Sequence, residues 1–300
     1  MRSERWRLHG CVVGLALSLA ACGRHEVEVG VLSDASAEDM TTPFGEPVLV
    51  EGLLDPTKDL SDPSLSQDML ELFFTSKANG TYDIWTSTRS DMSEPWAPAV
   101  VVDELSDESY ESEPSLSSDG LTLWFSSNRP GAPMVPRIWV THRPSRSEPW
   151  GVPEIMDWGT SDNDRGPSVD ATDLHIVFYS KRTTSGDEAD LYLASRSAKT
   201  ADFGQPSALS EINSPATDWD PGLFGDGLGL LFGSTREAQG WPDLYETARP
   251  SEDAPFIEPV PRAELNSTQA EGDPWLSNDG RYIIFASARD GASQLYEASR

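Results

Sequence analysis

Short apolar segments separated by turn signals dominate the chain. Residues 121–126 (LTLWFS) and 281–286 (RYIIFA) are rich in aromatic and β-branched residues, and each follows a turn signal, Asp119-Gly120 or Asn278-Asp279-Gly280. This pattern predicts short β-strands joined by tight turns. The 23 Gly and 23 Pro among 300 residues punctuate the whole chain and leave little room for long helices.

These segments recur as five copies of one unit. Similar segments open with prolines spaced 51, 53, 54 and 53 residues apart: Pro63, Pro114, Pro167, Pro221 and Pro274. A phenylalanine stands 11 residues after each of them: Phe74, Phe125, Phe178, Phe232 and Phe285. A repeat of this length predicts a propeller or solenoid in which each copy is one supersecondary unit.

A third block follows at a variable distance. An aliphatic-aromatic pair ends 11 to 14 residues after each phenylalanine, and an arginine comes four residues later: Arg89, Arg143, Arg196, Arg249 and Arg300. Blocks of constant length joined by a gap of variable length indicate strands joined by a surface loop. An extra residue in a strand would move the side chains that follow it to the opposite face of the sheet, whereas a loop tolerates insertions. Three strands per unit follow from this spacing.

A fourth strand is predicted after the arginine, where an aromatic residue stands near a proline: Trp96 with Pro98, Trp150 with Pro153, Phe203 with Pro206, and Phe256 with Pro259. Proline favours an edge position. Residues 44–50 (FGEPVLV) match this segment but precede the first unit, and the fifth unit ends at its third strand. If the front segment completes the last blade, residues 44–300 form an all-β, five-bladed β-propeller.

The repeat resembles the WD40-like propeller repeat of the TolB type. Its pattern is P-S-L-S-x-D-G-x-x-L-x-F-S-S-x-R, as in residues 114–129, followed by D-L-Y as in residues 243–245. The resemblance implies the fold over the whole repeat region. It says less about function, because this family includes the TolB subunit of the Tol-Pal system, propellers joined to peptidoglycan-binding modules, and propeller domains of serine peptidases. No G-x-S-x-G motif that would hold a peptidase nucleophile is present.

Carboxylates stand at two repeated positions beside the prolines. They directly precede the proline as Asp62, Glu113, Asp220 and Asp273, and precede it by three as Glu111, Asp164, Asp218 and Glu271. The first unit has Leu60 and the third Gly166 at these positions. We expect both sets to share a side of the strand and, with Trp219 and Trp275, to form a binding rim at one channel mouth.

The alternative is a structural role for the same acids. Arginines follow the second strand in four units, and each could pair with a carboxylate: Arg129, Arg182, Arg236 and Arg289, with Ala78 in the first unit. Such pairs would fix the ring without binding anything. The Asp-Gly sequences predict hairpin turns rather than calcium loops, and the histidines lack zinc spacing. We therefore predict no metal and no cofactor.

The N-terminus predicts export and lipidation. Arg2, Arg5 and Arg7 precede an uncharged apolar stretch from Cys11 to Ala21, which is typical of a signal peptide and too short for a lasting membrane span. Leu19-Ala20-Ala21-Cys22 resembles the lipobox of bacterial lipoproteins. We predict a signal peptide at 1–21, a lipidated flexible tether at 22–43 with the lipid on Cys22, and a place in the cell envelope, on the outer membrane facing the periplasm.

Charge narrows the range of partners. The net charge of -28 becomes -30 after loss of three Arg and one Glu with residues 1–21, so nucleic acid is excluded as a partner. We expect a monomeric, non-enzymatic binding or scaffold propeller that grips an envelope protein, peptide or glycan at an acidic channel mouth. The alternative is an enzyme resembling five-bladed glycoside hydrolases, with carboxylates in a central pocket.

Overall fold

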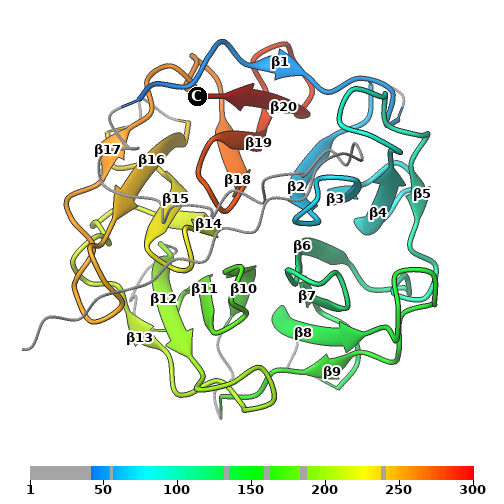
Figure 1. Cartoon of the computed structure of the whole chain (residues 1–300), viewed down its shortest axis with the longest axis horizontal. Helices are drawn as coiled ribbons and strands as arrows, with labels where there is room; N and C mark the ends of the chain where they lie inside the picture. The colour runs from blue at the N-terminus through cyan, green and yellow to red at the C-terminus, as the bar shows by residue number, and fades with distance from the viewer. Residues whose placement is uncertain (1–41, 55–56, 132–134, 159–162, 183–187, 238–240) are drawn as a thin grey trace, which may run out of the picture. The chain divides into compact units, whose positions relative to one another are not determined.

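A computed structural model describes residues 42–54, 57–131, 135–158, 163–182, 188–237 and 241–300. Over these residues the regular secondary structure is entirely β, arranged as five four-stranded antiparallel sheets. The innermost strands of successive sheets contact one another in a closed circle, so that β18 also contacts β2. The sheets are the blades of a propeller around a central channel (Figure 1). The predicted five-bladed β-propeller is confirmed.

Each of the first four blades takes its strands from consecutive stretches of chain, with the innermost strand first. Blade one contains β2 (Leu60–Leu65), β3 (Glu71–Ser76), β4 (Asp83–Thr88) and β5 (Val100–Val101). Blade two contains β6 (Glu111–Leu116), β7 (Thr122–Ser127), β8 (Arg137–His142) and β9 (Glu154–Ile155). Blade three contains β10 (Asp164–Val169), β11 (His175–Ser180), β12 (Asp190–Ser195) and β13 (Ser207–Ala208). Blade four contains β14 (Asp218–Phe224), β15 (Gly229–Ser234), β16 (Asp243–Ala248) and β17 (Val260–Pro261).

Blade five joins the two ends of the repeat region. It contains β18 (Glu271–Leu276), β19 (Tyr282–Ser287) and β20 (Gln294–Ser299), and its outermost strand is β1 (Val48–Leu49). Val48 pairs with Glu297 and Leu49 with Tyr296. The ring is therefore closed as predicted, by an early segment that completes the last blade (Figure 1).

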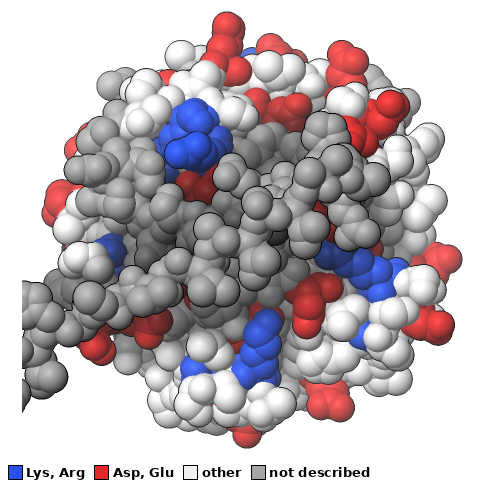
Figure 2. All heavy atoms as spheres, in the orientation of Figure 1, with Lys and Arg blue, Asp and Glu red and all other residues white. Residues whose placement is uncertain are grey.

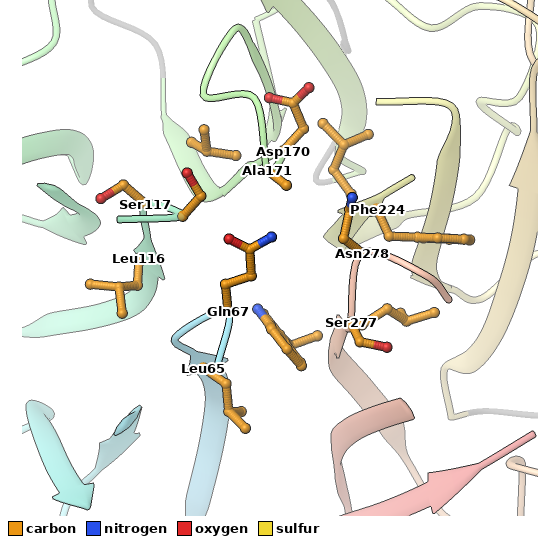
Figure 3. Close-up of a pocket in the computed structure, with 14 residues that line it drawn as sticks. Leu65, Gln67, Leu116, Ser117, Asp170, Ala171, Phe224, Ser277 and Asn278 are labelled. Atoms are coloured by element: carbon orange, nitrogen blue, oxygen red, sulfur yellow. The ribbon is translucent and has the colours of Figure 1, made fainter. Parts of the chain in front are cut away.

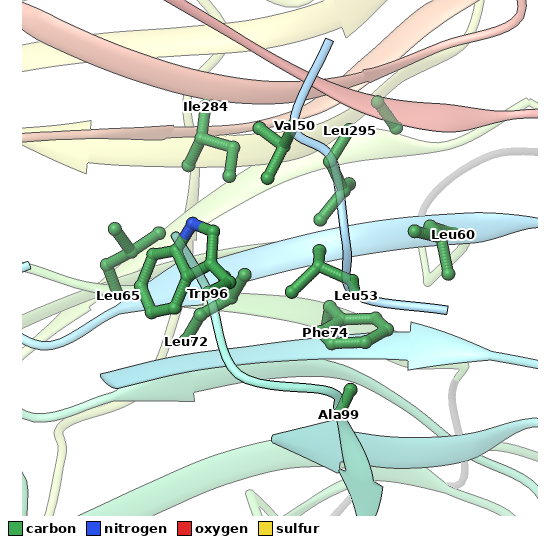
Figure 4. Packing of buried hydrophobic residues seen from close by; sticks show 11 residues of the cluster. Val50, Leu53, Leu60, Leu65, Leu72, Phe74, Trp96, Ala99, Ile284 and Leu295 are labelled. Atoms are coloured by element: carbon green, nitrogen blue, oxygen red, sulfur yellow. The ribbon is translucent and has the colours of Figure 1, made fainter. Parts of the chain in front are cut away.

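The core lies between the blades. All five repeat phenylalanines are fully buried. At the seam between blades five and one, Ile284 and Leu295 pack with Leu72, Phe74 and other apolar side chains (Figure 4). Burying apolar area between sheets is the main source of stability in such a ring, so an aromatic at this fixed position holds each blade to the next.

The arginine that ends each unit packs against the outermost segment of a blade. Its guanidinium stacks on the aromatic of that segment at 4.3 to 4.9 Å from the ring centre: Arg89 on Trp96, Arg143 on Trp150, Arg196 on Phe203, Arg249 on Phe256, and Arg300 on Phe44. The predicted fourth strand is present but has only two residues, and it begins after the proline rather than at the aromatic. Proline and short length together limit pairing at this edge.

A bulge interrupts every innermost strand at the acidic positions. The pairing register between the first two strands shifts there in all five blades. The residue before the proline has a positive φ in each: Asp62 (52°), Glu113 (57°), Gly166 (60°), Asp220 (46°) and Asp273 (52°). Bulges of this kind re-aim a side chain. They determine which carboxylates face the channel.

Candidate functional site

The acids three residues before the proline lie inside the blades. Glu111, Asp164, Asp218 and Glu271, which we call the anchor acids, are buried. Each contacts the arginine of its own blade at 2.6 to 3.7 Å: Arg129, Arg182, Arg236 and Arg289 in the same order. Burial raises the pKa of Glu111 to about 7, with Arg129 acting in the opposite direction. The anchor acids are therefore already bound to arginine, and each of these ion pairs forms within one blade rather than between two blades.

A serine completes this arrangement. In blade four, Ser234 donates a hydrogen bond to Asp218 at 2.6 Å and accepts one from Arg236 Nε at 3.0 Å. Blade one lacks the acid and the arginine together, because Leu60 and Ala78 stand in their places, and buried Leu60 joins the apolar cluster of the seam. The absence of both residues from blade one is expected on physical grounds, since either the acid or the arginine alone would be a buried charge without a partner.

The acids directly before the proline point into the channel. Asp62, Glu113, Asp220 and Asp273, which we call the channel acids, form with Gly166 and the five prolines a narrow collar around a cavity of about 40 Å³. The prediction that both sets share a side is wrong. The left-handed conformation at the second position, which lies within the bulge, separates the side chains of residues two apart.

Three of the channel acids lie together. Asp62, Asp220 and Asp273 line the same narrow collar, and each lies near enough to a neighbouring carboxylate for its charge to affect ionisation. Burial, together with the neighbouring carboxylates, raises the pKa of Asp220 to about 8, and the same causes raise the pKa of Asp62 and Asp273. Like charges at this distance cannot all ionise easily. No ion pair of the described residues involves any of these three.

The fourth channel acid is held by blade three. Glu113 accepts hydrogen bonds from Arg165 Nη2 at 2.8 Å, Tyr179 Oη at 2.6 Å and the Gly166 backbone N–H at 2.9 Å. Arg165 thus crosses the seam between blades two and three. A carboxylate with this set of donors is fixed in position.

Glycine at 166 makes this contact possible. A Cβ there would lie 2.6 Å from the ring of Tyr179, and the backbone has φ +60°. Blade three therefore exchanges the repeat's acid for a glycine, an arginine and a tyrosine that bind the acid of blade two.

A pocket of about 620 Å³ opens above the collar, at the start of the innermost strands. We call it the polar mouth. One or both residues of a cross-strand pair from each of four blades line its wall. These pairs differ in size: Ser61 with Thr75, Ser112 with Ser126, Arg165 with Tyr179, and Trp219 with Gly233. A Cβ at Gly233 would lie 2.8 Å from the Trp219 indole, so the glycine makes room for that ring. The largest side chains of these pairs come from blades three and four.

Two loops add aromatic side chains to the polar mouth, and polar atoms there lack partners. Tyr82 and Tyr110 line the pocket, and Tyr82 is 46 % exposed. The hydroxyls of Tyr110 and Ser112 are buried without a hydrogen-bond partner, and Ser112 as a whole is 5 % exposed. Buried hydroxyls without partners cost free energy, so a ligand that hydrogen-bonds to them would recover it.

The opposite end of the channel has a mixed lining. Leu65, Leu116, Leu223 and Trp275 line an opening there beside polar residues such as Gln67, and side chains from all five blades surround it (Figure 3). Trp275 also packs edge-on against Tyr282 at 6.5 Å. Trp219 and Trp275 therefore lie at opposite ends of the channel. The ten residues predicted as one rim belong to three places: the blade interiors, the collar with the polar mouth, and the opposite end of the channel.

Several residues of the polar mouth were missed by the sequence analysis. Arg165 and Tyr179 occupy repeat positions where the other units have Ser, Ser, Trp, Gly and Thr, Ser, Gly, Ala, respectively. This variability inside an otherwise regular repeat is the signal that could have found them. Tyr82 and Tyr110 lie outside the regular blocks, and nothing in their spacing indicates the pocket.

Other observations limit the chemistry of the described region. No group of His, Cys, Asp and Glu among the described residues is arranged to hold a metal ion, and no described helix is long and apolar enough to cross a membrane. Acidic side chains are spread over the face in Figure 2. The predicted signal peptide, the lipidation site Cys22 and nearly all of the tether lie outside the described residues.

The fold and site together define a five-bladed propeller with an acidic collar. No protein family model matches the chain, and no curated protein matches its sequence. Solved structures do match the fold. TolB from Acinetobacter baumannii is 14% identical with a TM-score of 0.51, and the match covers 82% of this chain and 56% of TolB. The chain thus matches little more than half of that protein, and this likeness concerns the propeller fold.

Glycoside hydrolases share the fold as well. The α-L-arabinofuranosidase PaAbf62A from Podospora anserina, in complex with cellotriose, is 11% identical with a TM-score of 0.57 over 86% of this chain and 96% of that one. An α-L-arabinofuranosidase from Lactobacillus brevis is 12% identical with a TM-score of 0.58 over 83% and 94%. At these identities the likenesses concern the fold alone, and they include both classes of function considered above.

Proposed function

We propose that this protein is a non-enzymatic binding propeller that receives its partner at the polar mouth. The observation that carries the proposal is the pocket of about 620 Å³ above the collar, with aromatic walls and with the buried hydroxyls of Ser112 and Tyr110 lacking partners. Concave sites with aromatic walls and a few convergent polar groups are typical of ligand binding.

The arrangement of the carboxyl groups favours binding over catalysis. A glycosidase needs two carboxyl groups about 5 to 9.5 Å apart, one on each side of the scissile bond. Asp62, Asp220 and Asp273 instead line one collar around a cavity of about 40 Å³, and Glu113 is held by Arg165 and Tyr179. A cavity this small leaves little room for a sugar ring between its carboxyl groups.

The place of action in this proposal is the cell envelope. The sequence at Cys22 supports a lipid anchor, and about 20 residues separate it from the first described residues. An extended tether of that length spans up to about 70 Å. Such a tether would let the propeller search a layer of the envelope near the membrane for an envelope protein, peptide or glycan.

A second candidate, a glycoside hydrolase, has one observation in its favour. The pKa of Asp220 is raised to about 8 by burial and by neighbouring carboxylates, so this group is protonated at neutral pH, while nearby Glu113 accepts hydrogen bonds from Arg165 and Tyr179. Two carboxyl groups in contrasting environments are what acid-base catalysis uses.

In-cell cross-linking tests the proposal. We expect the full-length protein to capture an envelope partner, and Trp219→Ala to reduce that capture at least tenfold while the matched change Trp241→Ala, at an exposed residue, leaves it intact. Equal capture by both variants would contradict binding at the polar mouth. Release of sugar from arabinoxylan or aryl glycosides by the wild type, lost in Asp220→Asn, would favour the hydrolase instead.

A further inference from the structure

We propose, building on the function above, that the polar mouth binds a lysine side chain of a partner polypeptide, with the ammonium group seated over Asp62, Asp220 and Asp273. The partner is thus a protein or peptide that presents an exposed lysine. Charge, shape and hydrogen-bonding capacity each support this assignment.

Charge at the polar mouth calls for a cation. Four carboxyl groups line the pocket. Arg165 is the one basic side chain among its described lining residues, and its guanidinium is already bound to Glu113 at 2.8 Å. The three aspartates therefore face the pocket without a basic partner, and a bound ammonium would relieve their mutual repulsion.

The shape of the channel selects a narrow charged group. The pocket of about 620 Å³ admits a short length of polypeptide, but the collar beneath it holds only about 40 Å³. An ammonium on an unbranched four-carbon stem is narrower than a planar guanidinium or a sugar ring, so it is the group that best suits this smaller space.

Hydrogen-bond acceptors also converge there. An ammonium group donates three hydrogen bonds. Carboxylate oxygens of the aspartates, with the Ser112 and Tyr110 hydroxyls that lack partners, can accept them. The ring of Tyr179 and the indole of Trp219 form the wall on the other side, where aromatic faces attract a cation.

Binding of the lysine ammonium is coupled to the release of protons. The other titratable residues that line the pocket with the three aspartates are Glu113, Arg165, Tyr110, Tyr179 and Tyr82. Because burial and neighbouring carboxylates raise the pKa of Asp62, Asp220 and Asp273, an ammonium that binds two of them as carboxylates must displace protons from them. Affinity should therefore rise from pH 6 to pH 8, where a free lysine remains charged.

Calorimetric titration of the full-length protein in detergent tests the proposal with three probes. These are acetyl-Gly-Lys-Gly-amide, the same peptide with norleucine in place of lysine, and a neutral xylotriose. We expect the lysine peptide to bind, with norleucine at least 30-fold weaker and with net proton release near pH 7. The variant D220N/D273N should bind the lysine peptide at least 30-fold more weakly.

A matched charge control is the variant E154Q/E258Q, which also removes two carboxylates, both from exposed positions. It should bind the lysine peptide within twofold of the wild type. Equal binding of norleucine, or equal weakening by both double variants, would overturn the lysine assignment. Binding of xylotriose alone would overturn it and leave the proposed function standing. If no probe binds and cross-linking in cells captures no partner, both proposals fail.

Discussion

The anchor acids and the channel acids are two residues apart in sequence and play opposite energetic roles. Asp218 is buried beside Arg236 at 2.7 Å and contributes to the interior of blade four. Asp220, the next residue but one, faces two other carboxyl groups and has a raised pKa. The left-handed residue in the bulge separates them. Carboxylates that look alike in a repeat can therefore be structural at one position and a liability to stability at the other.

The largest effect is expected from removing an arginine that pairs with an anchor acid. Arg236→Ala leaves Asp218 buried without its charge partner, and we expect a loss of about 3–5 kcal/mol in the free energy of unfolding. Urea denaturation of the purified protein would measure it.

Blade one supplies the matched control, since it carries Leu60 and Ala78 at these positions. The double variant Asp218→Leu with Arg236→Ala should regain at least half of the lost stability. A double variant less stable than Arg236→Ala alone would contradict the view that the two residues matter as a pair.

The next largest effect is expected at Gly166. Gly166→Ala places a Cβ 2.6 Å from the Tyr179 ring at a backbone φ of +60°, and should cost about 1–3 kcal/mol. The Tyr179 hydroxyl would also move away from Glu113, which a change in tyrosine absorbance on titration to high pH would report. Gly291→Ala is a control, because its φ is also positive but a Cβ there meets no atom within 4 Å.

The channel acids should make stability fall as the pH rises. Burial and neighbouring carboxylates raise the folded-state pKa of Asp220 to about 8, so the folded state binds more protons than the unfolded state above pH 4. Stability from this group is complete below pH 4 and is lost progressively up to pH 8. Thermal unfolding measured from pH 5 to pH 8 should show the decline.

Asp220→Asn keeps the hydrogen-bonding capacity and removes the charge. We expect it to raise the free energy of unfolding more at pH 8 than at pH 5, because more of the wild-type penalty for ionising Asp220 is present at the higher pH. Asp218→Asn, at the anchor position of the same strand, should instead lower stability at both pH values. If both amides stabilise the protein, the distinction between the two sets of acids is lost.

The smallest effect is expected at Ser112. Ser112→Ala removes a buried hydroxyl that has no hydrogen-bond partner, so stability should stay the same or rise by about 0.5 kcal/mol. Ser234→Ala, which removes a serine bonded to both Asp218 and Arg236, should lower stability by about 1–2 kcal/mol. Chemical denaturation of the two variants side by side would separate them.

The predictable part of this molecule is its repeat. The distance from Pro63 to Phe74 is the same in all five copies, because an insertion in a strand would move side chains to the opposite face of the sheet. The segment near Val48, which precedes the first unit, predicts that the ring closes by pairing with the last strand, as the structure has it. The direction of each carboxylate was not predictable, because it depends on the φ of a single residue in a bulge. Nor was the packing of Arg165 over the ring of Tyr110, since the two residues come from different blades and meet only because the blades form a ring.

The closing strand sets an order of events for this chain. Val48 pairs with Glu297 and Leu49 with Tyr296, so the ring needs partners nearly 250 residues apart. Bringing distant segments together is entropically costly and slow. The last blade cannot be completed until the C-terminal strand has been synthesised, and until then Phe44 lacks Arg300. Earlier blades can form while the ring is still open, and the collar acquires its full set of carboxylates only when folding is complete.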